Sequence, residues 1–141
     1  MKLSPSGINN VWDDISAAIE SSLIPTSSEA NDMRMFHIQK TLMSGAAGCW
    51  LVIRGEKTIL MIVAYINEDG FTKDRNLVIY SIYAFEYIAD SIWIYLNTEF
   101  KTMAKNHGCN KILAYSSIPR VVDIVNKLGW DTTYNFISTE V

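Results

Sequence analysis

The chain has no glycine between Phe71 and His107, although the apolar pattern of that stretch predicts a strand, a turn and a long helix. The first turn of such a helix can hold a phosphate only where small residues let the ligand come close to the main chain, which is why glycine is common there. The missing glycines therefore argue against a phosphate site at this turn.

Residues that bind metals or form disulfides are also scarce. The two histidines, His37 and His107, have no cysteine or carboxylate at metal-ligand spacing, so no structural zinc site is expected. Two cysteines, Cys49 and Cys109, are too few for a disulfide scaffold, and reduced, buried thiols are predicted. A Cys-His nucleophile is disfavoured because Gly108, between His107 and Cys109, is typical of a helix end.

Long apolar runs and basic stripes are absent. The longest apolar run, Ile59 to Ile66, is far shorter than the ~20 residues of a membrane span. Met1 to Asn10 lacks the apolar block of a signal peptide. The net charge is -3 and the lysines are scattered, unlike the basic surface that binds nucleic acid. We therefore expect a cytoplasmic protein with neither a membrane nor a nucleic-acid partner.

With 141 residues, 49% of them hydrophobic, the chain can bury the core of one domain, and a single domain over residues 1–141 is predicted. Two helices are expected near its start. The first ends before Pro25, and the second opens with the capping pattern Thr26 to Glu29 and stops at Gly45. The first of these helices is indicated by apolar residues at helical spacing, namely Trp12, Ile15, Ile19 and Leu23.

The centre of the chain reads as three antiparallel strands. Cys49 to Arg54 and Thr58 to Asn67 are apolar and β-branched, and a short turn with Gly55 separates them. A polar loop then leads to a third strand, Asn76 to Tyr83. These segments predict a meander.

Helix and strand alternate in the rest of the chain. We expect a helix from Glu86 to His107, a strand from Lys111 to Tyr115, a helix from Pro119 to Gly129 and a last strand from Thr132 to Thr139. This order predicts a mixed α/β (α+β) fold with a central sheet of about five to six strands. The antiparallel meander is extended by a parallel strand, and about four helices flank the sheet.

The order of elements from Cys49 onward resembles the core of the GNAT acetyltransferase family. A segment near the end of the chain resembles the family's closing signature, Y-x-k-l-G-F. It reads Val125, Asn126, Lys127, Leu128, Gly129, Trp130. The resemblance implies a GNAT-like fold with acetyl-CoA as its cofactor. In the family, the cofactor binds a Q/R-x-x-G-x-G/A segment between the third meander strand and the long helix.

The chain departs from the family at both functional positions. Bulky side chains and two carboxylates, expected in the first helical turn, disfavour a diphosphate there. Val125 stands where the family's proton-donating tyrosine is found, which leaves Tyr83 and Tyr115 as candidate catalytic residues. The degenerate cofactor segment reads Tyr83, Ala84, Phe85, Glu86, Tyr87, Ile88, Ala89, Asp90.

Three functions stay open. The first is a non-catalytic structural or interaction module without cofactor, which loosely resembles small virion-associated proteins of tailed phages and implies assembly into a virion inside the host cell. The second is an N-acetyltransferase with a divergent loop, in which main-chain groups of Asn76 to Tyr83 hold the pantetheine of acetyl-CoA. A bulge near Ile82 that opens a V-shaped cleft beside Lys111 to Tyr115 would favour the enzyme, whereas a sealed pocket would favour a sensor of a smaller acyl or amino ligand.

A protein partner or a second copy of the chain is expected at the strand Cys49 to Arg54. If no strand precedes it in the sheet, its open edge is a template for strand addition from another chain. In the alternative, Met1 to Leu3 covers part of this edge.

Overall fold

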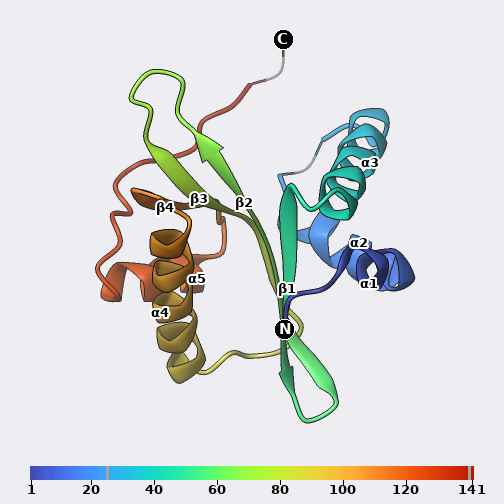
Figure 1. The fold of residues 1–141 in the computed structure, drawn as a ribbon, viewed down its shortest axis with the longest axis horizontal. Coiled ribbons are helices and arrows are strands. Elements are labelled where there is room, and N and C mark those ends of the chain that lie inside the picture. The colour runs from blue at the N-terminus through green and yellow to red at the C-terminus, as the bar shows by residue number, and fades with distance from the viewer. Residues whose placement is uncertain (25, 140) are drawn as a thin grey trace.

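The computed structural model describes residues 1–24, 26–139 and 141, in which two helical layers enclose one sheet (Figure 1). Helices α1, α2 and α3 cover one face of the sheet, and α4 and α5 cover the other. The helices are α1 (Pro5–Asn10), α2 (Trp12–Ser22), α3 (Ser28–Met43), α4 (Asp90–Asn106) and α5 (Pro119–Lys127), and the strands are β1 (Ala47–Arg54), β2 (Lys57–Glu68), β3 (Arg75–Ala84) and β4 (Lys111–Ala114).

The sheet confirms the predicted meander with its parallel addition. Its order is β1-β2-β3-β4, in which β1 and β3 pair antiparallel with β2, and β4 pairs parallel with β3. The sheet has four strands in the described part of the chain, so the expectation of five to six was wrong. Five helices, rather than about four, flank it over the same residues.

The predicted last strand, Thr132 to Thr139, is not formed in the described residues. The indole Nε1 of Trp130 donates to Asn97 in α4 (2.8 Å), and the Asn126 amide donates to Thr132 (3.0 Å). These bonds hold the start of the segment against the helices instead of along the outer edge of β4. High β propensity alone does not make a strand without a neighbour to pair with.

Helix α1 was not expected from the sequence. Ser4 caps it by accepting from the Gly7 amide (3.1 Å), and Pro5 occupies a first-turn position, where it costs no hydrogen bond. The chain then bends at Val11 before α2 begins. The Ser-Pro pair is a helix-start signal that could have revealed this element.

Helix α4 begins at Asp90, four residues later than predicted. The Phe85 amide donates to the Ile59 carbonyl (3.0 Å), which continues the sheet pairing past the end of β3. Ile88 is then buried in the core, so the chain reaches the helix only after this anchor. Of the two carboxylates expected in the first turn, only Asp90 is there, and Glu86 lies in the preceding loop.

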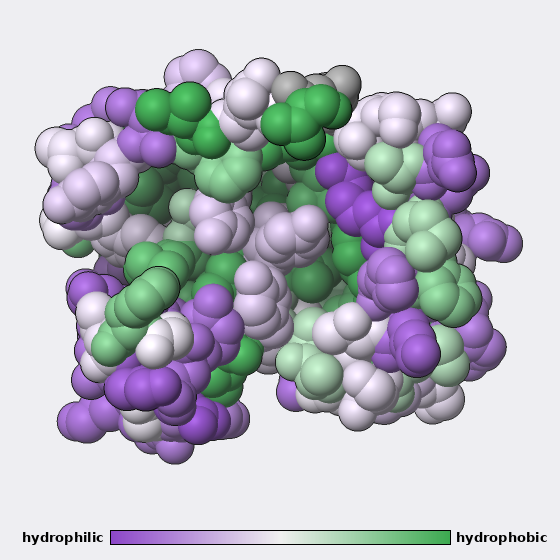
Figure 2. All heavy atoms as spheres, turned by 90° about the horizontal axis from the view of Figure 1, so that it is seen from above, coloured by the Kyte–Doolittle hydropathy of each residue, from purple (hydrophilic) through white to green (hydrophobic). Residues whose placement is uncertain are grey.

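Two apolar clusters form the core, one on each face of the sheet. Figure 2 shows apolar side chains gathered in the hollow between the two helical layers, with polar ones on the outer lobes. Cys49 lies in the cluster under α1 to α3, whereas Cys109 packs against the cluster under α4 and α5. The two thiols are free, and the intervening sheet keeps them apart.

Burial raises the pKa of the Cys49 thiol to about 11. The unfolded chain loses this proton near pH 9 while the folded protein keeps it, so the free energy of unfolding should fall between pH 9 and 11. The contribution lost is about 2 to 3 kcal/mol. Urea unfolding of the wild type and of Cys49→Ala should give a stability difference that shrinks over this range. A difference that stays constant with pH would show that the thiol does not contribute in this way.

The edge of β1 is partly covered, as the alternative reading proposed. The Met1 carbonyl accepts from the Leu51 amide (2.8 Å), and the Leu3 amide donates to the Cys49 carbonyl (2.9 Å). The edge therefore stays open to another strand only beyond Leu51, toward Arg54. In the part of the chain that is described, no helix is long and apolar enough to cross a membrane.

Candidate functional site

A bulge in β3 changes the direction of this strand. Val63 of β2 lies opposite Ser81, whereas the next residue, Ala64, lies opposite Ile79. Tyr80 is therefore the extra residue of a β-bulge, which bends a strand and increases its twist. The bulge near Ile82 that would favour the enzyme is thus present, two residues earlier in the chain.

The bulge marks the point where β3 and β4 part. Their pairing ends at Ile79 and Ala114, and the Tyr115 amide makes a last, long bond to the Ile79 carbonyl (3.3 Å). Beyond it, β3 continues beside β2 to Ala84 with no described strand on its other side. The two strands therefore lie apart beyond Ile79, and the unpaired edge of β3 borders the opening between them.

Main-chain groups of β3 line this opening. The Phe85 amide bonds to β2, and antiparallel pairing alternates along a strand, so Ser81 and Tyr83 also face β2. Ile82 and Ala84 consequently direct their N-H and C=O groups toward the side where β4 is missing. An extended ligand with amide groups can pair with them as an added strand does.

Arg120, at the start of α5, closes one end of the opening. Its guanidinium donates to the Ile88 carbonyl (2.8 Å) and to Asp90 Oδ1 (3.0 Å). The guanidinium carbon also lies 4.4 Å from the centre of the Tyr87 ring. One side chain thus ties the loop after β3 and the start of α4 to α5.

Glu86 is held by the turn between β1 and β2. It pairs with Arg54 and with Lys57, whose Nζ lies 2.7 Å from Glu86 Oε2. Asp90 is similarly paired with Arg120. The two carboxylates that were expected to repel a diphosphate are therefore each balanced by a base, which weakens the electrostatic argument against an anionic ligand.

A small pocket of about 100 Å³ lies in the opening. The side chain of Trp93 is 8% exposed, and its indole Nε1 is buried without a hydrogen-bond partner. Three buried polar side-chain atoms of the described residues have no partner, namely Arg34 Nε, Asn76 Oδ1 and Trp93 Nε1, and of these residues Trp93 lines this pocket. The lining consists of Ile82, Ala84, Glu86, Tyr87, Ile88, Trp93, Ile118, Arg120 and Val121.

These groups fit the pantetheine arm of acetyl-CoA. The arm is extended and carries two amides, which match the main-chain groups of Ile82 and Ala84 and the unpaired Nε1 of Trp93. The fit is poorer at the diphosphate, because Tyr87 and Arg120 occupy the approach to α4. A wider depression of about 460 Å³ between α5 and the chain after it contains Ser116 and Ser117, but no buried polar group.

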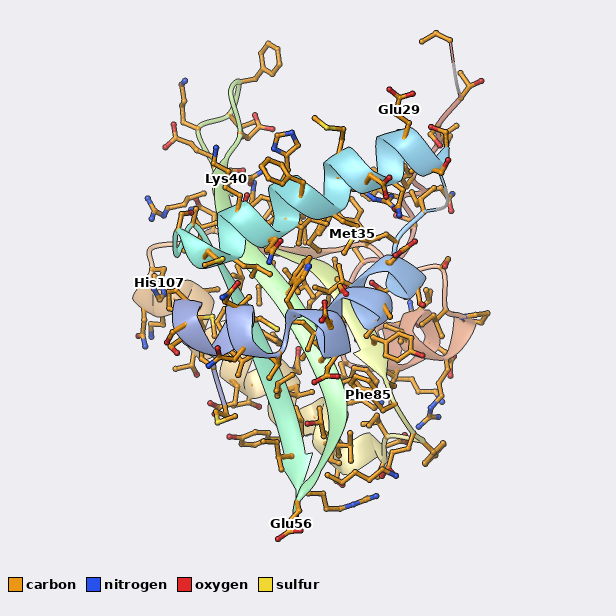
Figure 3. The ribbon with its side chains drawn as sticks, turned by 90° about the vertical axis from the view of Figure 1, so that its right-hand side faces the viewer. Glu29, Met35, Lys40, Glu56, Phe85 and His107 are labelled. Carbon is orange, nitrogen blue, oxygen red and sulfur yellow. The ribbon has the colours of Figure 1, made fainter. Side chains whose placement is uncertain are left out.

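Neither candidate tyrosine is among the residues that line the small pocket, and Tyr83 packs against the cluster under α1 to α3, on the other face of the sheet. Tyr115 follows β4 where the strands part, is 46% exposed and contacts the ring of Phe136 at 5.8 Å. Tyr83 lies near the end of β3, with its ring 5.1 Å from that of Phe85. Figure 3 shows Phe85 at this lower end of the sheet, on the side toward α1 and α2. The structure therefore does not bring Tyr83 and Tyr115 together.

Two tyrosines at the bulge were missed in the sequence. The rings of Tyr65 and Tyr80 meet edge to face at 6.1 Å. Burial first, and then the neighbouring Tyr115 and Tyr80, raise the pKa of Tyr65 above its ordinary value. No motif singles these residues out, because the signal is a register shift between strands distant in the chain.

Val125 is partly buried against the cluster under α4 and α5, and it has no acidic group to offer. Its carbonyl accepts from the Trp130 amide (2.9 Å), and the intervening Gly129 adopts a φ of +88°, which favours glycine. The closing segment thus ends α5 and anchors Trp130. The role of this segment is structural, so a proton donor would have to be a residue outside it.

Solved structures with this fold include several acetyltransferases. A ribosomal-protein-alanine N-acetyltransferase from Brucella melitensis biovar Abortus 2308 matches with a TM-score of 0.68 and 12% identity, covering 100% of this chain and 98% of that one. An aminoglycoside N-acetyltransferase in complex with CoA matches with a TM-score of 0.66 and 12% identity, over 99% and 91%. A transcriptional regulator from Bacillus halodurans C-125 gives 0.73 and 10%, over 100% and 99%.

These similarities show that the chain has the GNAT acetyltransferase fold, as the resemblance in the sequence implied. Neither the comparison with family models nor that with curated proteins gave a match.

Proposed function

We propose that the protein is an N-acetyltransferase that uses acetyl-CoA with a divergent cofactor loop. The observation that carries this proposal is the bulge at Tyr80, which ends the pairing of β3 with β4 and leaves the main chain of Ile82 and Ala84 facing a pocket. A non-catalytic module has no need of this opening, because a regular strand would bury its edge against β4. The solved acetyltransferases of this fold support the same reading.

Each part of the opening has a role in this proposal. Ile82 and Ala84 bind the pantetheine through their main chain, and Trp93 donates its indole proton to a pantetheine carbonyl. When bound, acetyl-CoA supplies an acyl group activated as a thioester. Tyr115, half-exposed where the strands part, holds on its hydroxyl the proton that a departing thiolate requires, and Tyr83 is the alternative donor.

Isothermal titration calorimetry tests the proposal. Acetyl-CoA and S-acetylpantetheine should each bind with a stoichiometry of one, because the pocket and the strand edge accept the part that both ligands share. Absence of binding by both ligands at millimolar concentration would contradict the proposal. It would favour the non-catalytic module, for which the Arg120 contacts and Val125 provide the structural argument.

Trp93→Phe should weaken the binding of S-acetylpantetheine roughly 3- to 10-fold, because one hydrogen bond is lost. The variant without ligand should be as stable as the wild type or more so, since a buried donor without a partner is removed while the ring remains. Calorimetry and urea unfolding measure the two effects. A matched Trp50→Phe change, in β1, should leave ligand affinity unchanged.

Other expectations follow from the same test. A pocket that takes only acetate or a free amine, and not the pantetheine arm, would identify the sensor of a smaller ligand. Strand addition beyond Leu51, toward Arg54, is the remaining place for a protein partner or a second copy on β1. The virion-associated role stays a prediction.

A further inference from the structure

We propose that the outer face of α3 binds the same face of a second copy of this chain, with the two α3 helices antiparallel across a twofold axis. Helix α3 covers one face of the sheet, whereas the small pocket lies among residues of the cluster under α4 and α5, on the other face (Figure 1). The proposed dimer is therefore independent of the proposed function.

The outer face of α3 carries apolar residues that the core does not use. Met33, Phe36 and Met43 are 55%, 56% and 41% exposed. Different residues of the same helix, Ile38 and Leu42, pack in the cluster under α1 to α3. A surface helix normally buries one apolar face and presents polar residues on the other, so a second apolar face indicates a surface that binds another protein.

The exposed residues of α3 have the spacing of a helix that packs along another helix. Glu29, Met33, Phe36, Lys40 and Met43 follow one another at alternating steps of four and three positions, which keeps them on one side of the helix. We call these five residues the α3 stripe. Figure 3 shows Glu29 and Lys40 toward opposite ends of α3, which crosses the near side of the molecule.

The two charges of the α3 stripe have no ion-pair partner in their own chain. Glu29 and Lys40 are exposed, and among the described residues neither forms an ion pair. No residue of opposite charge stands three or four positions from either of them along the helix. Both charges are therefore available to a partner.

The α3 stripe is complementary to itself when its direction is reversed. A twofold axis midway between the levels of Met33 and Phe36 places Met33 of one copy beside Phe36 of the other, and the symmetry forms this contact twice. The same axis places Glu29 of each copy beside Lys40 of the other. Parallel helices would instead bring Glu29 beside Glu29 and Lys40 beside Lys40, so charge favours the antiparallel arrangement.

The dimer should be weak. One helix of 16 residues from each copy, about 24 Å long, makes an interface at the small end of the specific ones. We therefore expect dissociation in the micromolar range. The apolar centre of the contact should supply most of the affinity, and the flanking ion pairs should set the direction of the helices.

Sedimentation velocity of the whole chain, at about 5 μM to 1 mM, measures the association. Phe36→Asp should weaken it at least roughly 10-fold, because it places a carboxylate in the apolar contact at two symmetric positions. Phe36 is exposed, so the variant should keep its fold, which circular dichroism checks. Tyr95→Asp, at a 61% exposed position of α4, is the matched control and should associate as the wild type does.

Exchange of the two charges tests the direction of the helices. Glu29→Lys and Lys40→Glu should each weaken association several-fold, because each single change places like charges side by side at both ends of the contact. The double variant Glu29→Lys/Lys40→Glu should recover the wild-type affinity, and an equimolar mixture of the two single variants should form a heterodimer. Glu99→Lys, an exposed change in α4, should have no effect.

Three outcomes would overturn the inference. A monomer at every concentration would show that the α3 stripe does not bind a second copy and would leave it to a different protein. Association that Phe36→Asp leaves unchanged would place the contact elsewhere, for example at the open part of β1 beyond Leu51. A double charge variant no stronger than the single variants would show that the helices do not lie antiparallel in this register. None of these measurements uses acetyl-CoA, so failure of the proposed function would leave their results unaffected.

Discussion

Deletion of Tyr80 should abolish the binding of S-acetylpantetheine and acetyl-CoA while the fold persists. Removing this one residue makes the pairing of Ile79 and Ser81 with β2 continuous, and it leaves every other residue of β3 on the face that it now occupies. The strand then loses the bend that turns it away from β4. The chain after Ala114 can pair along Ser81 and Ile82, which closes the opening.

The loss of affinity should exceed about 100-fold, because the main-chain bonds of Ile82 and Ala84 become unavailable to a ligand. Circular dichroism should show unchanged secondary structure. Tyr80→Ala is the control, since it removes the ring but keeps the extra residue, and its affinity should stay close to that of the wild type. Retained binding in the deletion variant would show that the bulge is not what admits the ligand.

The sequence predicts the parts of this fold that depend on local pattern. The strands β1, β2 and β3 were expected within a few residues of their ends, because apolar and β-branched runs with Gly55 between the first two specify a hairpin. The start of α5 at Pro119 and its end before Gly129 were also predicted, since both residues act on the main chain directly. Such signals need no knowledge of distant contacts.

The features that make the candidate site depend on distant contacts and were predicted less well. The later start of α4 follows from the Phe85 amide bonding to Ile59, a pairing between residues 26 positions apart. A bulge near Ile82 was named only as a feature that would favour the enzyme, because the register with β2 sets both its presence and its place at Tyr80. The unpaired donor of Trp93 is visible only once the pocket around it is formed.

The ion pairs near the start of α4 likewise depend on contacts between residues distant in the chain. Glu86 and Asp90 were expected as acids in the first turn of the long helix, but the sequence does not show which bases face them. Arg54 lies 32 residues before Glu86, and Arg120 lies 30 residues after Asp90. The fold brings these residues together, so each carboxylate faces a base and should repel an anionic ligand less than the sequence alone indicates.

Leu60→Ala should destabilise the protein by about 2 to 5 kcal/mol. Leu60 lies in the middle of the sheet, has 0% exposure and belongs to the cluster under α4 and α5. The cost combines lost apolar burial with the cavity left behind. This is a large part of the ~5 to 15 kcal/mol that a domain of this size has in total, and urea unfolding measures it.

The same substitution should also weaken ligand binding, because its cluster includes the pocket residues Ile88, Trp93 and Val121. Leu60 pairs across the strands with Ala84, whose main chain faces the opening, so a cavity at Leu60 lets that edge move. Leu113→Ala, at an edge position that is 38% exposed, is the control and should have a much smaller effect on both measurements. If Leu60→Ala lowered stability without changing the affinity for S-acetylpantetheine, the core and the opening would be energetically separate, and the rigidity of the strand edge would not depend on the packing behind it.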